Sequence, residues 1–189
     1  MTKGILQFAH QLLKNTIQEG DTIIDATCGN GHDTVFLSKL AGKSGHVFGF
    51  DIQTEAITHT AKRLQEQSPH KNTTLIQDSH SNFLHHIPVD KLTRLGGAIF
   101  NLGYLPGGDK QIITKSDSTI TAMEGIMTHL KPKGIIVLVI YHGHKGGKEE
   151  MQAIMKYARL LDQKQFAALY YGFINQKNNP PFILAIEKK

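Results

Sequence analysis

The chain has 189 residues, of which 40% are hydrophobic and 20% charged, and its formal net charge is +5 at pH 7. These proportions are typical of a soluble globular protein, and the length suits a single domain over 1–189. No apolar run approaches the roughly 20 residues that span a bilayer, and polar residues interrupt the segment 5–13, so we expect no membrane partner, no signal peptide and a cytoplasmic location. The single cysteine excludes an internal disulfide and argues against a cysteine-based zinc site.

Segments with apolar residues at helical spacing alternate along the chain with short apolar runs bounded by turn residues. The helical spacing predicts helices over 3–18, 33–40, 54–67, 79–86, 116–130 and 148–162. The short runs predict strands over 22–26, 46–51, 73–77, 95–101, 135–141, 166–173 and 182–186. The run 135–141 has no alternation of apolar and polar residues, which predicts a central strand buried on both faces.

This alternation of strands and helices predicts a parallel sheet with helices on both faces. The last two predicted strands are separated only by a short polar loop around 178–181. A parallel crossover needs a dozen or more residues, so these two strands must pair antiparallel. We therefore predict an α/β fold with a Rossmann-like, doubly wound, seven-stranded sheet that is mostly parallel and has one antiparallel strand near the C-terminus. That ending is typical of class I methyltransferases.

The segment Asp25-Ala26-Thr27-Cys28-Gly29-Asn30-Gly31 joins the first predicted strand to the next helix. Two glycines at this position let the backbone turn tightly and approach a ligand, and the helix N-terminus favours an anionic group. S-adenosylmethionine (SAM) carries a carboxylate that suits the helix end and an ammonium that suits Asp25. A plain turn between strand and helix is the alternative.

Two further acids end the next two predicted strands. Asp51 lies twenty residues after Gly31, where a carboxylate reaches the ribose hydroxyls of an adenosine. NAD would use the same acid, but its fingerprint requires a third small residue where Thr34 stands, and it needs no acid at position 25. Asp78 is placed to contact the adenine amino group, with Ser79 or His80 nearby, although an isolated acid after a strand is more often a helix cap.

The loops after the fourth and fifth predicted strands face the position of the cofactor's methyl group. The first begins at Asn101 and contains Tyr104, a spacing that partly matches the Asn-Pro-Pro-Tyr tetrad of amino-group methyltransferases. The second, Tyr141-His142-Gly143-His144-Lys145-Gly146-Gly147, offers an aromatic ring and two imidazoles that can act as a base near neutral pH. No acid or cysteine lies at ligand spacing from the two histidines, so we expect no metal.

Cys28 lies in the cofactor loop, where its neighbours supply no group that would activate a thiolate. A cysteine that attacks a pyrimidine ring would have to face the base from the catalytic loops. We therefore interpret Cys28 as a small apolar filler beside SAM and reject a covalent mechanism.

Together, the stretches 25–34 and 101–110 and the residues Tyr141-His142-Gly143-His144 resemble the small bacterial proteins labelled rRNA methylases, of the YtqB or MnmM type. The resemblance covers nearly the whole chain and implies a SAM-dependent enzyme that methylates the amine of 5-aminomethyl-(2-thio)uridine at the tRNA wobble position. One departure is Thr27, which replaces a glycine common in the broader class. The resemblance implies a set of residues around SAM: Asn30, His32, Asp33, Asp51, Gln53, Asp78 and His80.

The chemistry implied by the resemblance requires a neutral amine aligned with the methyl group. Asn101 would orient the amine, Tyr104 and Tyr141 would exclude water, and the proton acceptor is His142, His144 or Asp109. The partner would be a tRNA anticodon stem-loop, bound by the rim loops, the first helix and four lysines: Lys110, Lys115, Lys145 and Lys148. The small size of this surface suggests either a short RNA segment or help from a second subunit, as in a homodimer. Alternatives are another RNA methyltransferase, including one that acts on rRNA, a small-molecule methyltransferase, or an NAD-binding or non-enzymatic module.

Overall fold

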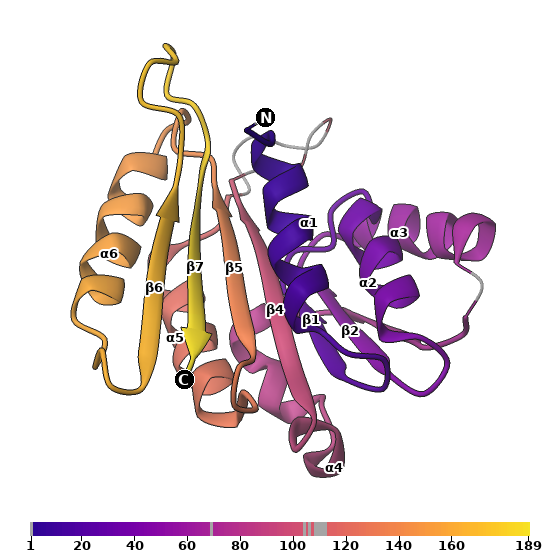
Figure 1. Ribbon diagram of the computed structural model, residues 1–189. Helices are drawn as coiled ribbons and strands as arrows, with labels where there is room; N and C mark the ends of the chain where they lie inside the picture. Colours follow the sequence, from indigo (N-terminus) through magenta and orange to yellow (C-terminus); the bar gives the residue numbers. More distant parts are fainter. Residues whose placement is uncertain (1, 69, 104, 106, 108–112) are drawn as a thin grey trace.

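The computed structural model describes residues 2–68, 70–103, 105, 107 and 113–189. Within these residues, seven strands form one sheet in the order β3-β2-β1-β4-β5-β7-β6 (Figure 1). The strands are β1 (Thr22–Asp25), β2 (His46–Asp51), β3 (Thr73–Gln77), β4 (Leu95–Leu102), β5 (Ile135–Ile140), β6 (Phe166–Tyr171) and β7 (Phe182–Lys188). The first five strands pair in parallel, whereas β7 lies between β5 and β6 and runs antiparallel to both. The predicted fold class and the predicted reversed strand are confirmed.

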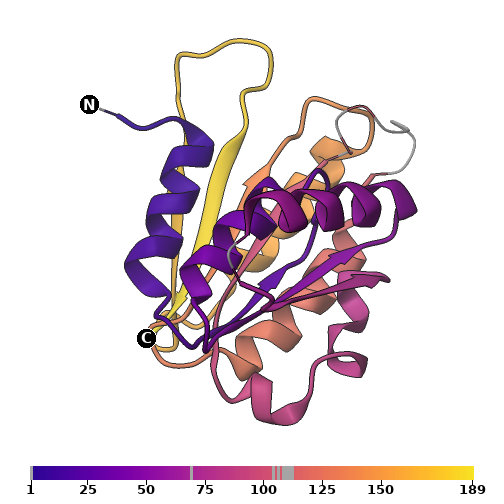
Figure 2. The same cartoon turned by 90° about the vertical axis from the view of Figure 1, so that its right-hand side faces the viewer.

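The register of the strands brings several connections together at one end of the sheet. Leu102 of β4 pairs with Ile140 of β5, which in turn pairs with Phe182 at the start of β7. The connections that follow β4 and β5, and the connection that precedes β7, therefore begin or end side by side. Figures 1 and 2 show the β5–α6 and β6–β7 connections at this same end of the molecule. We call this end of the sheet the rim.

The helices lie on both faces of the sheet. They are α1 (Ile5–Thr16), α2 (His32–Ala41), α3 (Thr54–Gln67), the 3₁₀ helix η1 (His80–His85), α4 (Val89–Leu92), α5 (Ser116–His129) and α6 (Gly147–Arg159). The helix predicted over 79–86 is therefore a 3₁₀ helix. The sequence did not predict α4, because four residues are too few to show a helical period. None of the helices in the described ranges is long and apolar enough to cross a membrane.

Two apolar layers, one on each face, hold the sheet in place. On one face, Ala9 and Leu13 of α1 and Leu37 of α2 pack on β1, β2 and β5. On the other face, η1, α4, α5 and α6 pack around Phe83 and Met123, both at most 1% exposed. All six residues of β5 are buried, which confirms the predicted central strand. The interior of the sheet is thus fixed on both sides, and polar groups at the rim are held by a rigid scaffold.

Candidate active site

A cavity of about 350 Å³ opens at the rim, beyond the carboxyl ends of β1, β2 and β4. Ligands of open α/β sheets bind in this position. The cavity is lined by residues from four connections: Ala26, Thr27, Gly29, Asp51, Ile52, Gln53, Asp78, Ser79, His80, Asn101, Gly103, Leu105, Ile113, Thr114, Lys115 and Ser118. Six of the predicted cofactor residues and the predicted amine-orienting residue Asn101 are therefore brought together.

The turn between β1 and α2 depends on its two glycines. Gly29 and Gly31 have φ angles of +51° and +80°, which L side chains rarely adopt. A Cβ on Gly31 would also lie 2.8 Å from the Cα of Thr60 in α3, so only glycine lets these two segments approach. Arg63 of α3 donates a hydrogen bond to the Asn30 carbonyl at 2.7 Å. The turn is thus closely packed on α3, and its backbone forms one wall of the cavity.

Two predicted cofactor residues lie behind this wall. The Asp25 carboxylate is fully buried and accepts hydrogen bonds from the Thr27 backbone N–H at 3.2 Å and the Thr34 hydroxyl at 2.6 Å. Burial, and secondarily the charge of Asp33, raises the pKa of Asp25 to about 7. Asp25 therefore holds the turn from inside and does not line the cavity, so the structure places it away from the position expected for an ammonium partner.

Cys28 also lies behind the wall, 4% exposed and packed beside Gly49 of β2. Burial, followed by the charges of Asp25 and Asp51, raises the pKa of the Cys28 thiol well above its usual value. A thiol that remains protonated is a poor nucleophile. The placement agrees with the predicted apolar filler.

Asp51 occupies the end of β2 and lines the cavity. Its two carboxylate oxygens each accept a backbone N–H at 3.0 Å, one from Gly29 and one from Gln53. Burial raises the pKa of Asp51, and these hydrogen bonds oppose that shift by stabilising the carboxylate. The carboxylate thus fixes the glycine turn to the start of α3 and presents its edge to the cavity.

The end of β3 contributes Asp78, Ser79 and His80. Asp78 accepts hydrogen bonds from the Ser79 backbone and from the Asn82 side chain, and it contacts His86 Nε2 at 2.8 Å. These contacts, led by the one to His86, lower the pKa of Asp78. Part of its hydrogen-bonding capacity therefore serves the first turn of η1, where Ser79 is the N-cap.

His80 is 8% exposed, and its Nδ1–H donates to the Ala26 carbonyl at 3.0 Å. Burial lowers the pKa of His80, so the ring is neutral at neutral pH. Its Nε2 has no hydrogen-bond partner within the described part of the chain, although the residue lines the cavity. A buried nitrogen acceptor beside a cavity fits a ligand that brings its own N–H or O–H donor.

The end of β4 presents Asn101 through a chain of polar contacts. The Asn101 backbone N–H donates to the Thr27 hydroxyl at 2.7 Å, and its side-chain Nδ2 donates to Asp33 Oδ2 at 2.7 Å. The other Asp33 oxygen contacts Nε2 of His10, in α1, at 2.6 Å. The His10 ring stacks on Phe36 with the ring centroids 3.9 Å apart. Asp33 does not line the cavity, but it holds a residue that does.

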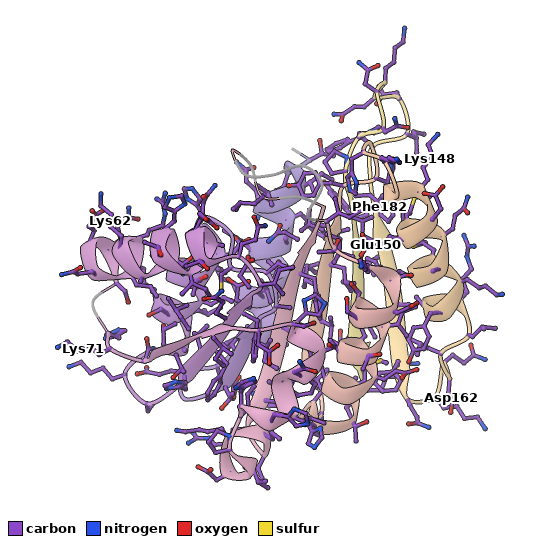
Figure 3. All side chains as sticks on the ribbon, turned by 180° about the vertical axis from the view of Figure 1, so that it is seen from behind. Lys62, Lys71, Lys148, Glu150, Asp162 and Phe182 are labelled. Atoms are coloured by element: carbon purple, nitrogen blue, oxygen red, sulfur yellow. The ribbon has the colours of Figure 1, made fainter. Side chains whose placement is uncertain are left out.

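A second set of contacts joins Gly103 and Thr114, which lie near the two ends of the connection between β4 and α5. The Thr114 hydroxyl accepts the Gly103 N–H at 3.1 Å and donates to Glu150 Oε2 at 2.7 Å, while the Thr114 N–H donates to the Gly103 carbonyl at 3.0 Å. Thr119 of α5 contacts the other Glu150 oxygen at 3.3 Å. Glu150 is 5% exposed, and this burial raises its pKa. Figure 3 shows Glu150 on α6, close to the rim.

The predicted acceptor loop after β5 lies beside Gly103. A Cβ on Gly103 would lie 3.4 Å from Tyr141 Cβ and 3.7 Å from His144 Nε2. Burial, followed by the charge of Asp33, raises the pKa of Tyr141. Burial, followed by the charges of Lys148 and His144, lowers the pKa of His142. The centroid of the His142 ring lies 5.7 Å from the centroid of the Phe182 ring. His142 is therefore neutral at neutral pH.

Nine predicted residues are not among those that line the cavity: Asp25, Cys28, Asn30, Gly31, His32, Asp33, Tyr141, His142 and His144. Tyr104 and Asp109 lie outside the described residues. Sequence reasoning missed Thr114 and Glu150, which are 36 residues apart and meet only in the fold. It also missed His10, which the sequence analysis treated only as a polar residue within the helix predicted over 3–18. Among the described residues, no group of three or more His, Cys, Asp or Glu side chains could hold a metal ion.

The cavity lies where open α/β sheets bind their ligands, and comparison with known proteins identifies the family of the chain. The family described as "Putative rRNA methylase" matches residues 47–187. The chain belongs to this methylase family. The tRNA (mnm(5)s(2)U34)-methyltransferase, chloroplastic, of Arabidopsis thaliana is 35% identical over 195 aligned residues, which span 99% of the chain and 70% of that protein. The chain is therefore a methyltransferase.

Solved structures of members of this family have the same fold over the whole chain. A protein from Clostridium thermocellum described as a "putative rRNA-methylase" superposes with a TM-score of 0.94 at 43% identity, and all of each chain is covered. A methyltransferase from Streptococcus mutans, solved in complex with SAH, superposes with a TM-score of 0.89 at 36% identity, again with complete coverage of both chains.

Proposed function

We propose that the protein transfers a methyl group from SAM to the primary amine of 5-aminomethyl-(2-thio)uridine at the wobble position of tRNA, giving the 5-methylaminomethyl form. The observation that carries the proposal is Asn101, whose amide lies at the cavity with Nδ2 bound to Asp33 and Oδ1 unused among the described residues. An amide oxygen that faces a cavity is a suitable acceptor for the N–H of an amine. The Arabidopsis relative, which is named for this modification, supports the same substrate.

The described residues fit SAM as the methyl donor. The cavity of about 350 Å³ is within the range of small-molecule sites. Asp51 would hold the ribose hydroxyls, and Nε2 of His80 and the Asp78 carboxylate would receive donors from the adenine side. The backbone of the Gly29–Gly31 turn and the start of α2 would meet the methionine end, with Asn30, His32 and Asp33 nearby. The SAH complex of the Streptococcus mutans neighbour supports this choice of cofactor.

Bound SAM supplies a methyl group made electrophilic by its sulfonium sulfur. The amine lone pair would take this methyl group, and the electrons of the broken C–S bond would stay with sulfur in SAH. Asn101 orients the amine by accepting one of its N–H groups, and Tyr141 shields the reacting atoms from water. Methyl transfer leaves the nitrogen as a positively charged secondary ammonium, which would release a proton to a base on the rim. His142 is suited to this role because its lowered pKa keeps the ring neutral.

The surface of the rim fits a single-stranded RNA loop. Segments 141–148 and 170–181 contain three lysines, Lys145, Lys148 and Lys177, and no acidic residue. A Cβ on Gly143 would lie 3.6 Å from Asn179 Cβ, so the two segments form one continuous surface. Lysines would contact phosphates, and exposed aromatic rings such as Tyr141, 37% exposed, would stack on unpaired bases. A cytoplasmic location and a homodimer belong to the same proposal.

The decisive experiment is mass spectrometry of tRNA nucleosides from a strain that lacks the gene. We expect 5-aminomethyl-type uridine to accumulate and its methylated form to vanish, and the purified protein with SAM should restore the methyl group in vitro. Unchanged tRNA together with a missing methyl group in ribosomal RNA would instead assign the protein to rRNA. Modification of neither RNA, with no tRNA binding at low salt, would favour a small-molecule substrate.

A further inference from the structure

A polar chain of three residues links α1 to the cavity. His10 Nε2 lies 2.6 Å from Asp33 Oδ1, and Asp33 Oδ2 accepts a hydrogen bond from Asn101 Nδ2 at 2.7 Å. The three residues are far apart in sequence and come from α1, the first turn of α2 and the end of β4. Only Asn101 reaches the cavity.

The chemistry of Asp33 determines which way the Asn101 amide faces. An ionised carboxylate only accepts hydrogen bonds, so the amide must turn its NH₂ group toward Asp33 and its oxygen away from it. The same rule requires that His10 present an Nε2–H to the other carboxylate oxygen. Asp33 is thus held between two donors, and its side chain is only 13% exposed. Charge-assisted hydrogen bonds of this kind are about twice as strong as neutral ones.

The His10 ring is itself held in place. It stacks on Phe36 with the ring planes 3° apart, and Phe36 belongs to α2, the helix that also carries Asp33. The backbone of Asn101 is held separately, because its N–H donates to the Thr27 hydroxyl. The amide of Asn101 is therefore constrained at its backbone by the cofactor turn and at its side chain by Asp33.

We propose that His10 is a positioning residue of the methyl-transfer site, which acts through Asp33 to keep the Oδ1 of Asn101 facing the acceptor amine. The proposal rests on the amine-methylating function proposed above. His10 touches neither substrate nor cofactor. Its effect is to keep one amide rotamer populated, so that the amine meets an oxygen acceptor and not an NH₂ donor that would repel its N–H groups.

Two matched variants separate hydrogen bonding from packing. His10→Phe keeps an aromatic ring to stack on Phe36 but has no N–H, whereas His10→Gln keeps an N–H at a similar reach and has no ring. We expect His10→Phe to lower kcat for methylation roughly 10- to 100-fold, because small misplacements of a reacting group have effects of this size. We expect His10→Gln to retain most of the wild-type kcat, and SAM affinity to stay within about twofold in both variants.

The control is His59→Phe, which makes the same exchange at an exposed histidine of α3 and should leave kcat unchanged. A double variant tests the route: in an Asn101→Ala background, His10→Phe should lower the residual rate no further. The proposal is overturned if His10→Phe keeps the wild-type kcat, if His10→Gln is as defective as His10→Phe, or if the two effects multiply in the double variant.

A second readout needs no substrate, so it stands even if the substrate proposed above is wrong. The side-chain NH₂ of Asn101 gives a pair of signals in ¹H–¹⁵N spectra, which can be assigned from their loss in Asn101→Ala. His10→Phe should shift this pair and speed its exchange with water, while His10→Gln and His59→Phe should leave it near its wild-type position. An unchanged pair in His10→Phe would show that His10 does not hold the amide. Failure of the wild-type protein to methylate tRNA would count against the proposed function alone.

Discussion

Replacement of Asp25 by Asn should remove a pH dependence from the stability of the fold. Asp25 is fully buried behind the cofactor turn, and its carboxylate accepts hydrogen bonds from Thr27 N–H and the Thr34 hydroxyl. An asparagine of the same shape can accept from Thr27 through Oδ1 and donate through Nδ2 to the Thr34 oxygen, because a hydroxyl both donates and accepts. Asp25→Asn therefore copies the protonated acid, but it cannot ionise.

The size of the effect follows from the pKa of Asp25. Burial and the charge of Asp33 raise this pKa from 3.8 to about 7. Between these values the folded protein binds a proton that the unfolded chain has released, so the stabilising effect is complete below pH 4 and is lost as the pH rises toward 7. At about 1.4 kcal/mol for each pH unit, a window of about three units corresponds to a loss of about 4 kcal/mol.

Urea unfolding of the wild type and of Asp25→Asn at pH 4, 6 and 8 measures this loss. Titrating groups remote from Asp25 are shared by the two proteins and cancel in the difference of their free energies of unfolding, whereas Asp33 and Asp51, which interact with Asp25, contribute to that difference. We expect similar stability at pH 4 and an advantage of about 4 kcal/mol for Asp25→Asn at pH 8. Asp90→Asn, at an exposed acid of α4, should show no such trend. A difference between wild type and Asp25→Asn that does not change with pH would refute the assignment of a raised pKa to Asp25.

Three further predictions concern the site. Asp51→Ala should abolish SAM binding measured by calorimetry while the circular dichroism spectrum stays native, and normal binding would show that the ribose lies elsewhere. Thr114→Val should lower kcat roughly 10-fold and the free energy of unfolding by about 1–3 kcal/mol, since it removes the hydroxyl that donates to Oε2 of buried Glu150 and leaves only the longer contact from Thr119 to Oε1 among the described residues; Thr121→Val, at an exposed position of α5, should change neither. The buried thiol of Cys28 should react with a disulfide reagent only after unfolding in guanidinium, and rapid labelling of the native protein would contradict its burial.

The fold could be predicted from the sequence because its signals are local and consistent. An apolar run such as 135–140 indicates a strand that is covered by helices on both faces, and the short loop before Phe182 permits only an antiparallel return. The one missed element, α4, is a single turn after Pro88. Its position depends on Leu92, which packs into the core made by distant residues, and no local pattern reports such a contact.

The site could be predicted only in part. Strand ends locate Asp51, Asp78 and Asn101 because the carboxyl ends of parallel strands meet at one edge. The same reasoning placed Asp25 in the cavity, but the side chain of the last residue of a buried strand can turn inward, and here Thr34 binds it there. His10 could not be found from sequence, because its contact to Asp33 depends on how α1 packs across the sheet.

The insertion of β7 between β5 and β6 has a consequence for how such enzymes can change their targets. The cavity is lined by the connections after β1, β2, β3 and β4, whereas the β6–β7 connection, which carries Lys177, belongs to a hairpin on the other side of β5 in the strand order. Within the sheet, the hairpin pairs with the other strands only through the contact of β7 with β5. We therefore expect that its turn can vary in length and sequence without straining the cavity. Exchange of residues 172–181 between relatives would therefore test whether this turn sets the proposed RNA specificity, because the residues that line the cavity stay unchanged.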